Sequence, residues 1–460
     1  MNPERVRHLI QRQTQNPKKY VLYWMQQSQR VHYNLALNVA IQLANQENLP
    51  LVVFFGLTSD YPDANSRHYP FLLEGIREVK QDLETLGACF CLFQGSPEEA
   101  IKPLLADALI VVCDAGHQTI QREWRKNLYF HLIKHYPDLD YYQVETDLIV
   151  PVDIASDKLE YGAYTLRPKL KRSIPAFLDF DPLPDLHVKA TVDCFSFASN
   201  TVPESVSNPN WTPQQVISLS EYFTGGYREA KKRLEHFIHQ KLSRYEESND
   251  PSLALTSTLS PYLHFGQIGV LEIVHSIMSA SGPESQKAAF LEQVIVRREL
   301  AFNFIHFNPH YADFSHITES WAYQSMTIHE KDPRPYHYTV NDYLAFKTHD
   351  PYFNAAMKQL VLTGFMENYL RMYWAKKIIE WSSTYREAFE TTLYLNNTYF
   401  LDGRDANSYA GIAWCYGRHD RAWPERPIFG KLRYMNQAGL ERKFKMNDYL
   451  ERIKQIEQSY

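Results

Sequence analysis

Strand and helix patterns alternate along the first 145 residues, and this alternation restricts the fold more than any other feature of the chain. Five short apolar runs have the length and composition of strands: 20–26, 49–57, 88–95, 107–114 and 139–145. Helical patterns lie between them, at 30–46, at 66–86, from Pro97 and at 117–135. Strands that alternate with helices form a parallel, doubly wound sheet with helices on both faces. We therefore expect an α/β domain over residues 1–150, with any ligand at the carboxyl ends of its strands.

The remainder of the chain has a different pattern. Residues 151–214 contain eight prolines and a basic patch, TLRPKLKRS at 165–173, which together predict a long connector. Helical patterns dominate from residue 215 onward, at 226–245, 264–280, 285–305 and 354–382. No GxGxxG or P-loop pattern follows a predicted strand, which disfavours dinucleotide and triphosphate sites of those types. We expect three parts: the α/β domain at 1–150, the connector at 151–214 and an all-α domain at 215–460.

Net charge, cysteine content and hydropathy limit the partners and the location that we expect for the protein. The net charge is −5, so a nucleic-acid-binding face must be local; residues 421–460 hold nine Lys and Arg against five Asp and Glu. The five cysteines form no CxxC pair, which favours free thiols, a cytoplasmic location and no metal site. The chain lacks an apolar leader and any stretch long enough to span a bilayer, so we expect a soluble monomer without membrane contact.

The stretch from 361 to 435 combines a buried charge with many aromatic side chains. Arg371 lies among apolar residues of a helical pattern and needs an acidic or anionic partner if it is buried. Asp402 and Asp405 follow on a tight turn, and Trp374 and Trp381 lie two helical turns apart. These residues alone leave two interpretations open: an ion pair within an aromatic core, or a site for an aromatic redox cofactor.

Three further segments carry candidate binding groups. TSTLSPYLHFG (256–266) places hydroxyls and backbone amides at a helix start, where they either cap the helix or bind phosphate. LEQVIVRRELAFNF (291–304) places polar side chains within an apolar helix, where each needs a ligand or a neighbouring helix as its partner. GRHDRAWPERPIFGKLRYMN (417–436) interleaves cations with aromatic residues, which suits phosphate contact and base stacking. His419 adjoins Asp420, but no third residue completes a hydrolytic triad.

These segments make the chain recognisable. Its sequence resembles the class II cyclobutane pyrimidine dimer photolyases of the photolyase/cryptochrome family over essentially its whole length. The strongest matches are GRHDRAWPERPIFGKLRYMN, RMYWAKKIIEW, LDGRDANSY and LSPYLHFGQI. The resemblance implies an N-terminal α/β antenna domain, a C-terminal helical domain that holds FAD, and DNA containing pyrimidine dimers as the partner. It also implies repair by an electron that passes from photoexcited, reduced FAD to the flipped-out lesion. A second antenna chromophore of folate or deazaflavin type is possible within the family, and no residue identifies it.

The resemblance assigns roles to individual residues. Arg371 and Asp402 become the ion pair beside the flavin, and Asn396 faces its reactive ring nitrogen. Further FAD contacts are expected from Tyr245, Thr256, Ser257, Leu259, Ser260, Arg298, Asn303, Asn368 and Asp405. Trp414 and Met372 are expected to meet the lesion, Gln293 to bond it, and Trp374 and Trp381 to relay electrons. The remaining DNA contacts are expected from Asn249, Arg297, Arg418, Arg421, Arg426 and Lys431.

The sequence departs from the family at four positions. Ser248 replaces an arginine before Asn-Asp-Pro, Gln293 replaces a glutamate, Glu367 lies in an altered segment, and Phe353 replaces the middle tryptophan of the relay. Glu367 lies four residues before Arg371 and is a candidate ion-pair partner for it. Two alternatives therefore stay open: a cryptochrome-type photoreceptor or a repair enzyme for another lesion, and a nucleotide-binding transferase built on the N-terminal sheet.

Overall fold

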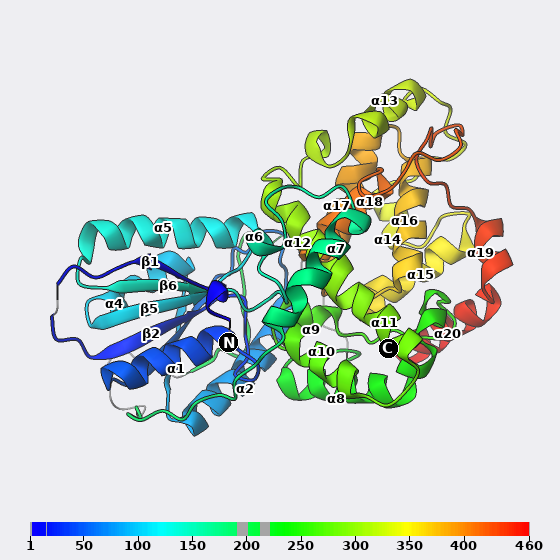
Figure 1. The fold of residues 1–460 in the computed structure, drawn as a ribbon. Helices are drawn as coiled ribbons and strands as arrows, with labels where there is room; N and C mark the ends of the chain where they lie inside the picture. The colour runs from blue at the N-terminus through cyan, green and yellow to red at the C-terminus, as the bar shows by residue number, and fades with distance from the viewer. Residues whose placement is uncertain (1, 15, 191–200, 212–220, 460) are drawn as a thin grey trace.

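The computed structural model describes the chain except for residues 1, 15, 191–200, 212–220 and 460. A sheet with its covering helices forms one half of the molecule and a group of helices forms the other (Figure 1). The predicted architecture of an α/β part followed by a helical part is confirmed. The predicted connector includes residues outside the described range, Cys194 among them.

The sheet has six strands in the order β1-β6-β5-β2-β3-β4. The five predicted strands are all present and parallel to one another: β2 (Tyr20–Met25), β3 (Leu51–Leu57), β4 (Cys89–Gln94), β5 (Ala108–Asp114) and β6 (Asp140–Val144). The sequence did not predict β1 (Val6–Ile10), which pairs with β6 in the antiparallel direction. This strand lies at the edge and exposes Arg7 and His8, so it lacks the apolar run of the buried strands.

Alternate side chains of the central strand β2 point into two different cores. Val21, Tyr23 and Met25 pack with residues of α1 (Leu35–Glu47) and α2 (His68–Leu86). Tyr20, Leu22 and Trp24 pack on the other face with residues of α5 (Thr119–His135). Figure 1 shows α5 on one side of the sheet and α1 and α2 on the other. Because both faces are covered, the strand is apolar at every position.

Helices make up the second half, and several differ from the predicted ranges. The first are α8 (Tyr227–Gln240), the 3₁₀ segment η5 (Leu242–Asn249), α9 (Ser260–His264) and α10 (Val270–Ser279). The stretch predicted as one helix at 285–305 consists of α11 (Glu284–Leu291), a π-helical segment η6 (Glu292–Arg297) and α12 (Arg298–Phe307). The next are α13 (Ser320–His329), α14 (Val340–Leu344), α15 (Pro351–Thr363) and α16 (Asn368–Trp381). The last are α17 (Tyr385–Tyr399), α18 (Ala406–Cys415), α19 (Gln437–Lys443) and α20 (Met446–Ser459).

The prediction of one long helix at 354–382 is wrong. Gly364 has a φ of +73° and ends α15, and α16 begins only at Asn368. A residue in the left-handed backbone conformation cannot continue a right-handed helix. Glycine adopts this conformation without steric cost. The break matters for the site, because it brings Phe365 and Met366 to the wall of a cavity.

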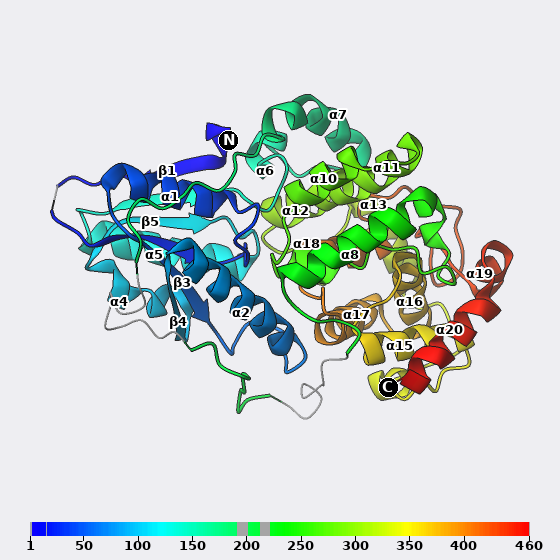
Figure 2. The same ribbon diagram turned by 90° about the horizontal axis from the view of Figure 1, so that it is seen from below.

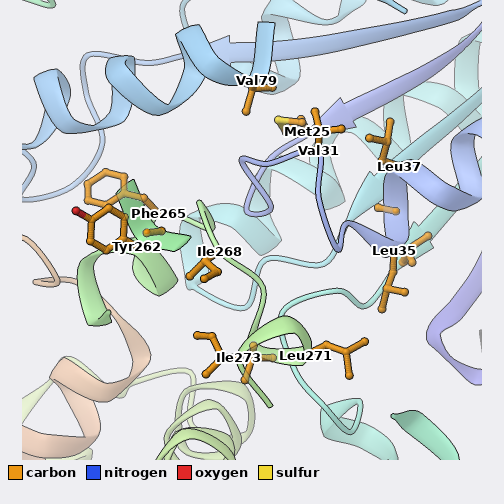
Figure 3. Close-up of a cluster of buried hydrophobic side chains, with 14 of the residues drawn as sticks. Met25, Val31, Leu35, Leu37, Val79, Tyr262, Phe265, Ile268, Leu271 and Ile273 are labelled. Atoms are coloured by element: carbon orange, nitrogen blue, oxygen red, sulfur yellow. The ribbon is translucent and has the colours of Figure 1, made fainter. Parts of the chain in front are cut away.

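The sheet half and the helical half share one apolar core. Met25, Leu35 and Leu37 of the first half belong to the same buried cluster as Tyr262, Phe265 and other residues of α9 and α10. Figure 3 shows these side chains between the β2 end of the sheet and the helices. The connector runs along the helical half through α6 (Val152–Ala155), α7 (Ala163–Ser173) and η2 (Ile174–Phe177) (Figures 1 and 2), and α7 packs against η6.

Two simpler expectations can also be compared with the structure. Cys91, Cys113 and Cys415 have free thiols, as predicted, and these three side chains and that of Cys89 are buried. Among the described residues, none of the helices combines the length and the apolar character that crossing a bilayer requires.

Candidate functional site

A cavity of ≈ 790 Å³ lies within the helical half. This volume is in the range of pockets that hold small molecules and cofactors. Its walls come from η5, the loop before α9, η6, α12, the start of α16, the end of α17 and α18. Seventeen of the residues predicted for the site line it: Tyr245, Asn249, Thr256, Ser257, Leu259, Ser260, Gln293, Arg297, Arg298, Asn368, Arg371, Met372, Trp374, Asn396, Asp402, Asp405 and Trp414.

Arg371 and Asp402 form a two-pronged ion pair in the cavity wall. Arg371 Nη1 and Nη2 each donate to a different carboxylate oxygen of Asp402, both at 3.0 Å. Arg371 Nε donates to the carbonyl oxygen of Met366 at 2.9 Å, and the guanidinium lies 4.1 Å from the ring centre of Phe400. Such a bidentate pair fixes the plane of the guanidinium as well as its position.

A second carboxylate, Asp405, stays ionised beside the same wall. Burial alone raises the pKa of Asp405, but the nearby His264 and Arg298 outweigh burial and hold this pKa at about 2. His264 Nδ1 lies 3.5 Å from Asp405 Oδ2. Asn396 also lines the cavity, and its Nδ2 donates to Asn397 Oδ1 at 3.0 Å, which leaves its oxygen available to a ligand. The wall therefore presents fixed charges and an oriented amide.

The loop before α9 does not cap that helix with a side chain. Leu259 is the N-cap residue of α9 and no side-chain cap bond is present. Thr256, Ser257 and Ser260 line the cavity instead. The capping interpretation is therefore not supported, and the hydroxyls remain available for a phosphate group.

Two cations that the sequence did not identify lie behind this loop. Arg233 Nη1 donates to Thr258 Oγ1 at 3.2 Å, and Lys241 Nζ donates to the carbonyl oxygen of Thr256 at 3.3 Å. Burial and repulsion from Arg233 and Arg452 lower the pKa of Lys241. An anion bound at the loop would relieve that repulsion. Both cations come from the amphipathic segment at 226–245, whose charges the sequence pattern assigns to solvent.

The π-helical segment shapes the opposite wall. Gln293, Val294, Arg297 and Arg298 all line the cavity, since residues three to four positions apart share one side of a helix. Arg298 also pairs with Asp147, at 2.8 Å between Nη2 and Oδ1. The Arg298 guanidinium therefore has an ion-pair partner in the segment after β6, and the same residue also lines the cavity.

Six predicted site residues do not line the cavity, and three of them, Asn303, Arg418 and Trp381, are buried elsewhere. Asn303 Oδ1 accepts from the backbone N–H of Glu160 at 2.8 Å, and its Nδ2 donates to Lys158, so its amide fixes the connector. Arg418 is buried and pairs with Glu319 at 2.6 Å, which removes it from the surface that could meet DNA. Trp381 is buried at the far end of α16.

The tryptophans of α16 are separated by residues of α15. Trp374 lines the cavity, and its Nε1 donates to Met357 Sδ at 2.9 Å. Trp381 lies 5.0 Å from Phe353 between ring centres and 5.1 Å from Tyr338. Phe353 of α15 therefore packs against Trp381, and Met357 of the same helix contacts Trp374.

Trp414 begins a stack of alternating rings and cations that leads from the cavity to the surface. The guanidinium of Arg433 lies 5.1 Å from the ring centre of Trp414 and 4.7 Å from that of Trp423. The guanidinium of Arg421 lies 5.0 Å from the ring centre of Trp423. Arg433 was not among the predicted site residues, although it lies in the same basic-aromatic segment. The predicted DNA contacts Arg421, Arg426 and Lys431 are all exposed in this segment.

Glu367 does not pair with the side chain of Arg371. It is buried and forms an ion pair with Arg452 of α20. The helix break at residues 364–367 turns Glu367 away from the cavity, so a spacing of four residues does not bring the two side chains together. Ser248, in contrast, does line the cavity.

A second, smaller cavity of ≈ 100 Å³ lies between the two halves. It is lined by Trp24, Met25 and Phe55 at the carboxyl ends of β2 and β3, and by His264 and Arg404 from the helical half. Arg404 Nη1 lies 2.9 Å from His68 Nε2, and its pKa is lowered by burial. This is the edge of the sheet where the sequence pattern predicts a ligand.

Comparison with known proteins agrees with this geometry. Residues 21–187 match the family model described as DNA photolyase. The chain is 42% identical to a deoxyribodipyrimidine photo-lyase of Methanothermobacter thermautotrophicus, over 99% of each chain. It is 36% identical to the protein of that name from Potorous tridactylus, over 98% of this chain and 85% of the relative.

Solved structures agree at the level of the fold. A class III photolyase from Agrobacterium tumefaciens superposes with a TM-score of 0.70 at 18% identity, over 96% of this chain and 87% of that one. A cryptochrome from Synechocystis superposes with a TM-score of 0.72 at 15% identity, over 95% and 89%.

Proposed function

The chain belongs to the DNA photolyase family, and from this premise we propose that it is a class II enzyme that repairs cyclobutane pyrimidine dimers in DNA with blue light and FAD. The observation that carries the proposal is the cavity with its Arg371–Asp402 pair, its hydroxyl loop and its indole at Trp414. We expect the protein to act as a cytoplasmic monomer. The antenna domain would occupy 1–150, the connector 151–214 and the FAD- and DNA-binding domain 215–460.

The residues present fit FAD. The loop at 256–260, with Arg233 and Lys241 behind it, suits the two phosphates, since its hydroxyls serve no helix cap. Tyr245 is held between Phe237 and Phe290 and offers a flat ring beside that loop. Arg371 and Asp402 would hold the flavin ring system, with Asn396, Asp405, Asn368 and Arg298 around it.

The protein contributes position and electrostatics. FAD, when bound and reduced, supplies the photoexcited electron that opens the cyclobutane ring. Asn396 would orient its free amide oxygen toward the flavin, while the ionised Asp405 and the Arg371–Asp402 pair set the local field. Trp414 and Met372 would pack against the extruded dimer, and Gln293 would hydrogen-bond it.

DNA would be held at the mouth of this cavity. The segment 417–436, which contains Arg433 and Trp423, exposes Arg421, Arg426 and Lys431. The cavity wall exposes Arg297 and Asn249. Cations of this kind fix the backbone, whereas the cavity selects the lesion. Trp374 and Trp381 would carry electrons for flavin reduction, with Phe353 as an interruption.

A second chromophore would bind in the smaller cavity at the sheet edge. A structure of Sulfolobus tokodaii photolyase to which this chain is similar, at 14% identity, holds two FAD molecules, with the implication of a novel light-harvesting cofactor. The ≈ 100 Å³ cavity holds only part of such a molecule, so a folate, deazaflavin or flavin pigment would extend beyond it. A folate or deazaflavin would add absorption to that of FAD in the spectrum of the purified protein, and a flavin pigment would raise the flavin content above one per chain.

Illumination of the reduced protein with a dimer-containing oligonucleotide tests the function. We expect intact pyrimidines to appear under blue light and none in the dark. Normal flavin photoreduction without repair would refute the proposal and favour a photoreceptor or another lesion. A protein that stays colourless after addition of FAD would favour the nucleotide-binding transferase instead.

A further inference from the structure

The connector helix α7 has an exposed face that the proposed function does not use. Tyr164, Pro168, Lys171 and Arg172 are all exposed and follow a spacing of four, three and one residues. At this spacing they form one stripe along the helix. Residues of the opposite face, Leu166 among them, are buried against the rest of the protein.

The stripe begins beside the large cavity. Tyr161, just before α7, accepts a hydrogen bond from His419 Nδ1 through its carbonyl oxygen at 2.8 Å. Its hydroxyl donates to the carbonyl oxygen of Asp420 at 3.2 Å. His419 is part of the cavity wall. The start of α7 is therefore continuous with the mouth through which a lesion would enter.

An ion pair fixes the helix against the cavity wall as well. Arg167 of α7 donates two hydrogen bonds to Glu292 of η6, at 3.1 and 2.7 Å. Glu292 immediately precedes Gln293, which lines the cavity. Lys169 is also paired, with Glu160. The position of α7 relative to the cavity is thus fixed by charged contacts on its flank, and these do not involve the stripe.

The stripe has the chemistry of a nucleic-acid contact. Within the part of the chain that the structure describes, neither Lys171 nor Arg172 pairs with a carboxylate. Tyr164 is 64% exposed, and its ring centre lies 6.0 Å from that of Tyr161. An exposed ring followed by unpaired cations, on a chain with a net charge of −5, suits base stacking and phosphate contact.

We propose that α7 is a second DNA-contact element that follows the strand as it leaves the cavity. Tyr164 stacks on a base next to the extruded dimer, and Lys171 and Arg172 bind backbone phosphates. The nine residues from Tyr164 to Arg172 span about 12 Å along the helix axis. This inference rests on the proposed function, because it requires that the lesion enters the large cavity.

Binding measurements on the flavin-loaded protein test it with three variants. Tyr164→Ala should weaken affinity for a dimer-containing duplex about tenfold, whereas Tyr164→Phe should bind normally, since stacking needs only the ring. Lys171→Gln/Arg172→Gln should reduce the slope of log K against log salt by roughly 1.8, because each lost phosphate contact removes about 0.9. Flavin content and photoreduction should not change in any of them.

Matched variants on the sheet half provide the control. Phe130→Ala removes an exposed ring from α5, and Lys126→Gln/Lys134→Gln removes two exposed cations from the same helix. Neither should alter affinity or the salt slope beyond a small general charge effect. Equal losses in the α5 and α7 variants would overturn the inference, as would wild-type affinity in the α7 variants. If the wild-type protein binds no dimer-containing DNA, the proposed function fails first and the inference fails with it.

Discussion

Removal of the Arg371 guanidinium provides the sharpest test of the flavin site. In Arg371→Ala the Asp402 carboxylate loses both charge-assisted hydrogen bonds while its side chain is only 7% exposed. Breaking one partner of a buried pair costs roughly 3–5 kcal/mol, and the lower end applies here because Arg371 itself is 23% exposed. The orphaned carbonyl of Met366 adds about 1 kcal/mol. We expect the free energy of unfolding of the flavin-free protein to fall by about 4 kcal/mol.

Urea unfolding, followed by tryptophan fluorescence, measures this loss, and flavin stoichiometry after purification measures its effect on the site. Arg371→Ala/Asp402→Asn should recover about 2 kcal/mol, because the second change removes the unpaired charge. Arg371→Lys should give an intermediate loss, since an ammonium cannot reproduce the two-pronged geometry. Wild-type stability and flavin content in Arg371→Ala, or strictly additive losses in the double variant, would refute the reasoning.

Three other measurements follow from the structure. Phe353→Trp should speed flavin photoreduction, measured by absorbance under blue light, because an indole carries a hole and a phenyl ring does not; an unchanged rate would mean that another residue already bridges the gap. Arg433→Ala should weaken dimer binding about tenfold while leaving flavin content unchanged, because Trp414 loses its stacked cation. Burial raises the pKa of Glu299 to about 8. Its folded-state pKa thus exceeds the unfolded one, so stability should fall as pH rises from about 4.5 to 8, and Glu299→Gln should flatten that slope.

Much of the fold could be predicted because local patterns specify it. The strands β2 to β5 are mainly apolar runs, since both faces of a parallel sheet are covered, and these runs and the tyrosine-containing β6 were visible in the sequence. The edge strand β1 was missed because it exposes charged side chains. The helix break at Gly364 was missed for another reason: an isolated glycine within a helical pattern is tolerated, and only the backbone angle shows that it ends α15.

The candidate site was predicted largely by resemblance, and the structure shows why individual residues differ. Asn303 and Arg418 are of residue types that often contact ligands. In the structure, however, the Asn303 amide bonds the connector and the Arg418 guanidinium pairs with Glu319. Arg233 and Lys241 have the pattern of solvent-facing charges, yet both reach the loop at 256–258. A polar side chain in a sequence reveals that it needs a partner; which partner it finds depends on packing.

The sequence by itself determined the alternation of strands and helices, the aromatic and charged composition of the cavity wall, and the need of a buried Arg371 for an acidic or anionic partner. These follow from backbone propensity, from the exclusion of apolar groups from water and from the requirement that a buried charge be neutralised. Only the tertiary structure decided that Glu367 turns to Arg452, that Arg298 reaches Asp147 and that α7 lies beside His419. Each of these contacts joins residues more than 80 positions apart, and their geometry is set by how whole helices pack, which no local pattern encodes.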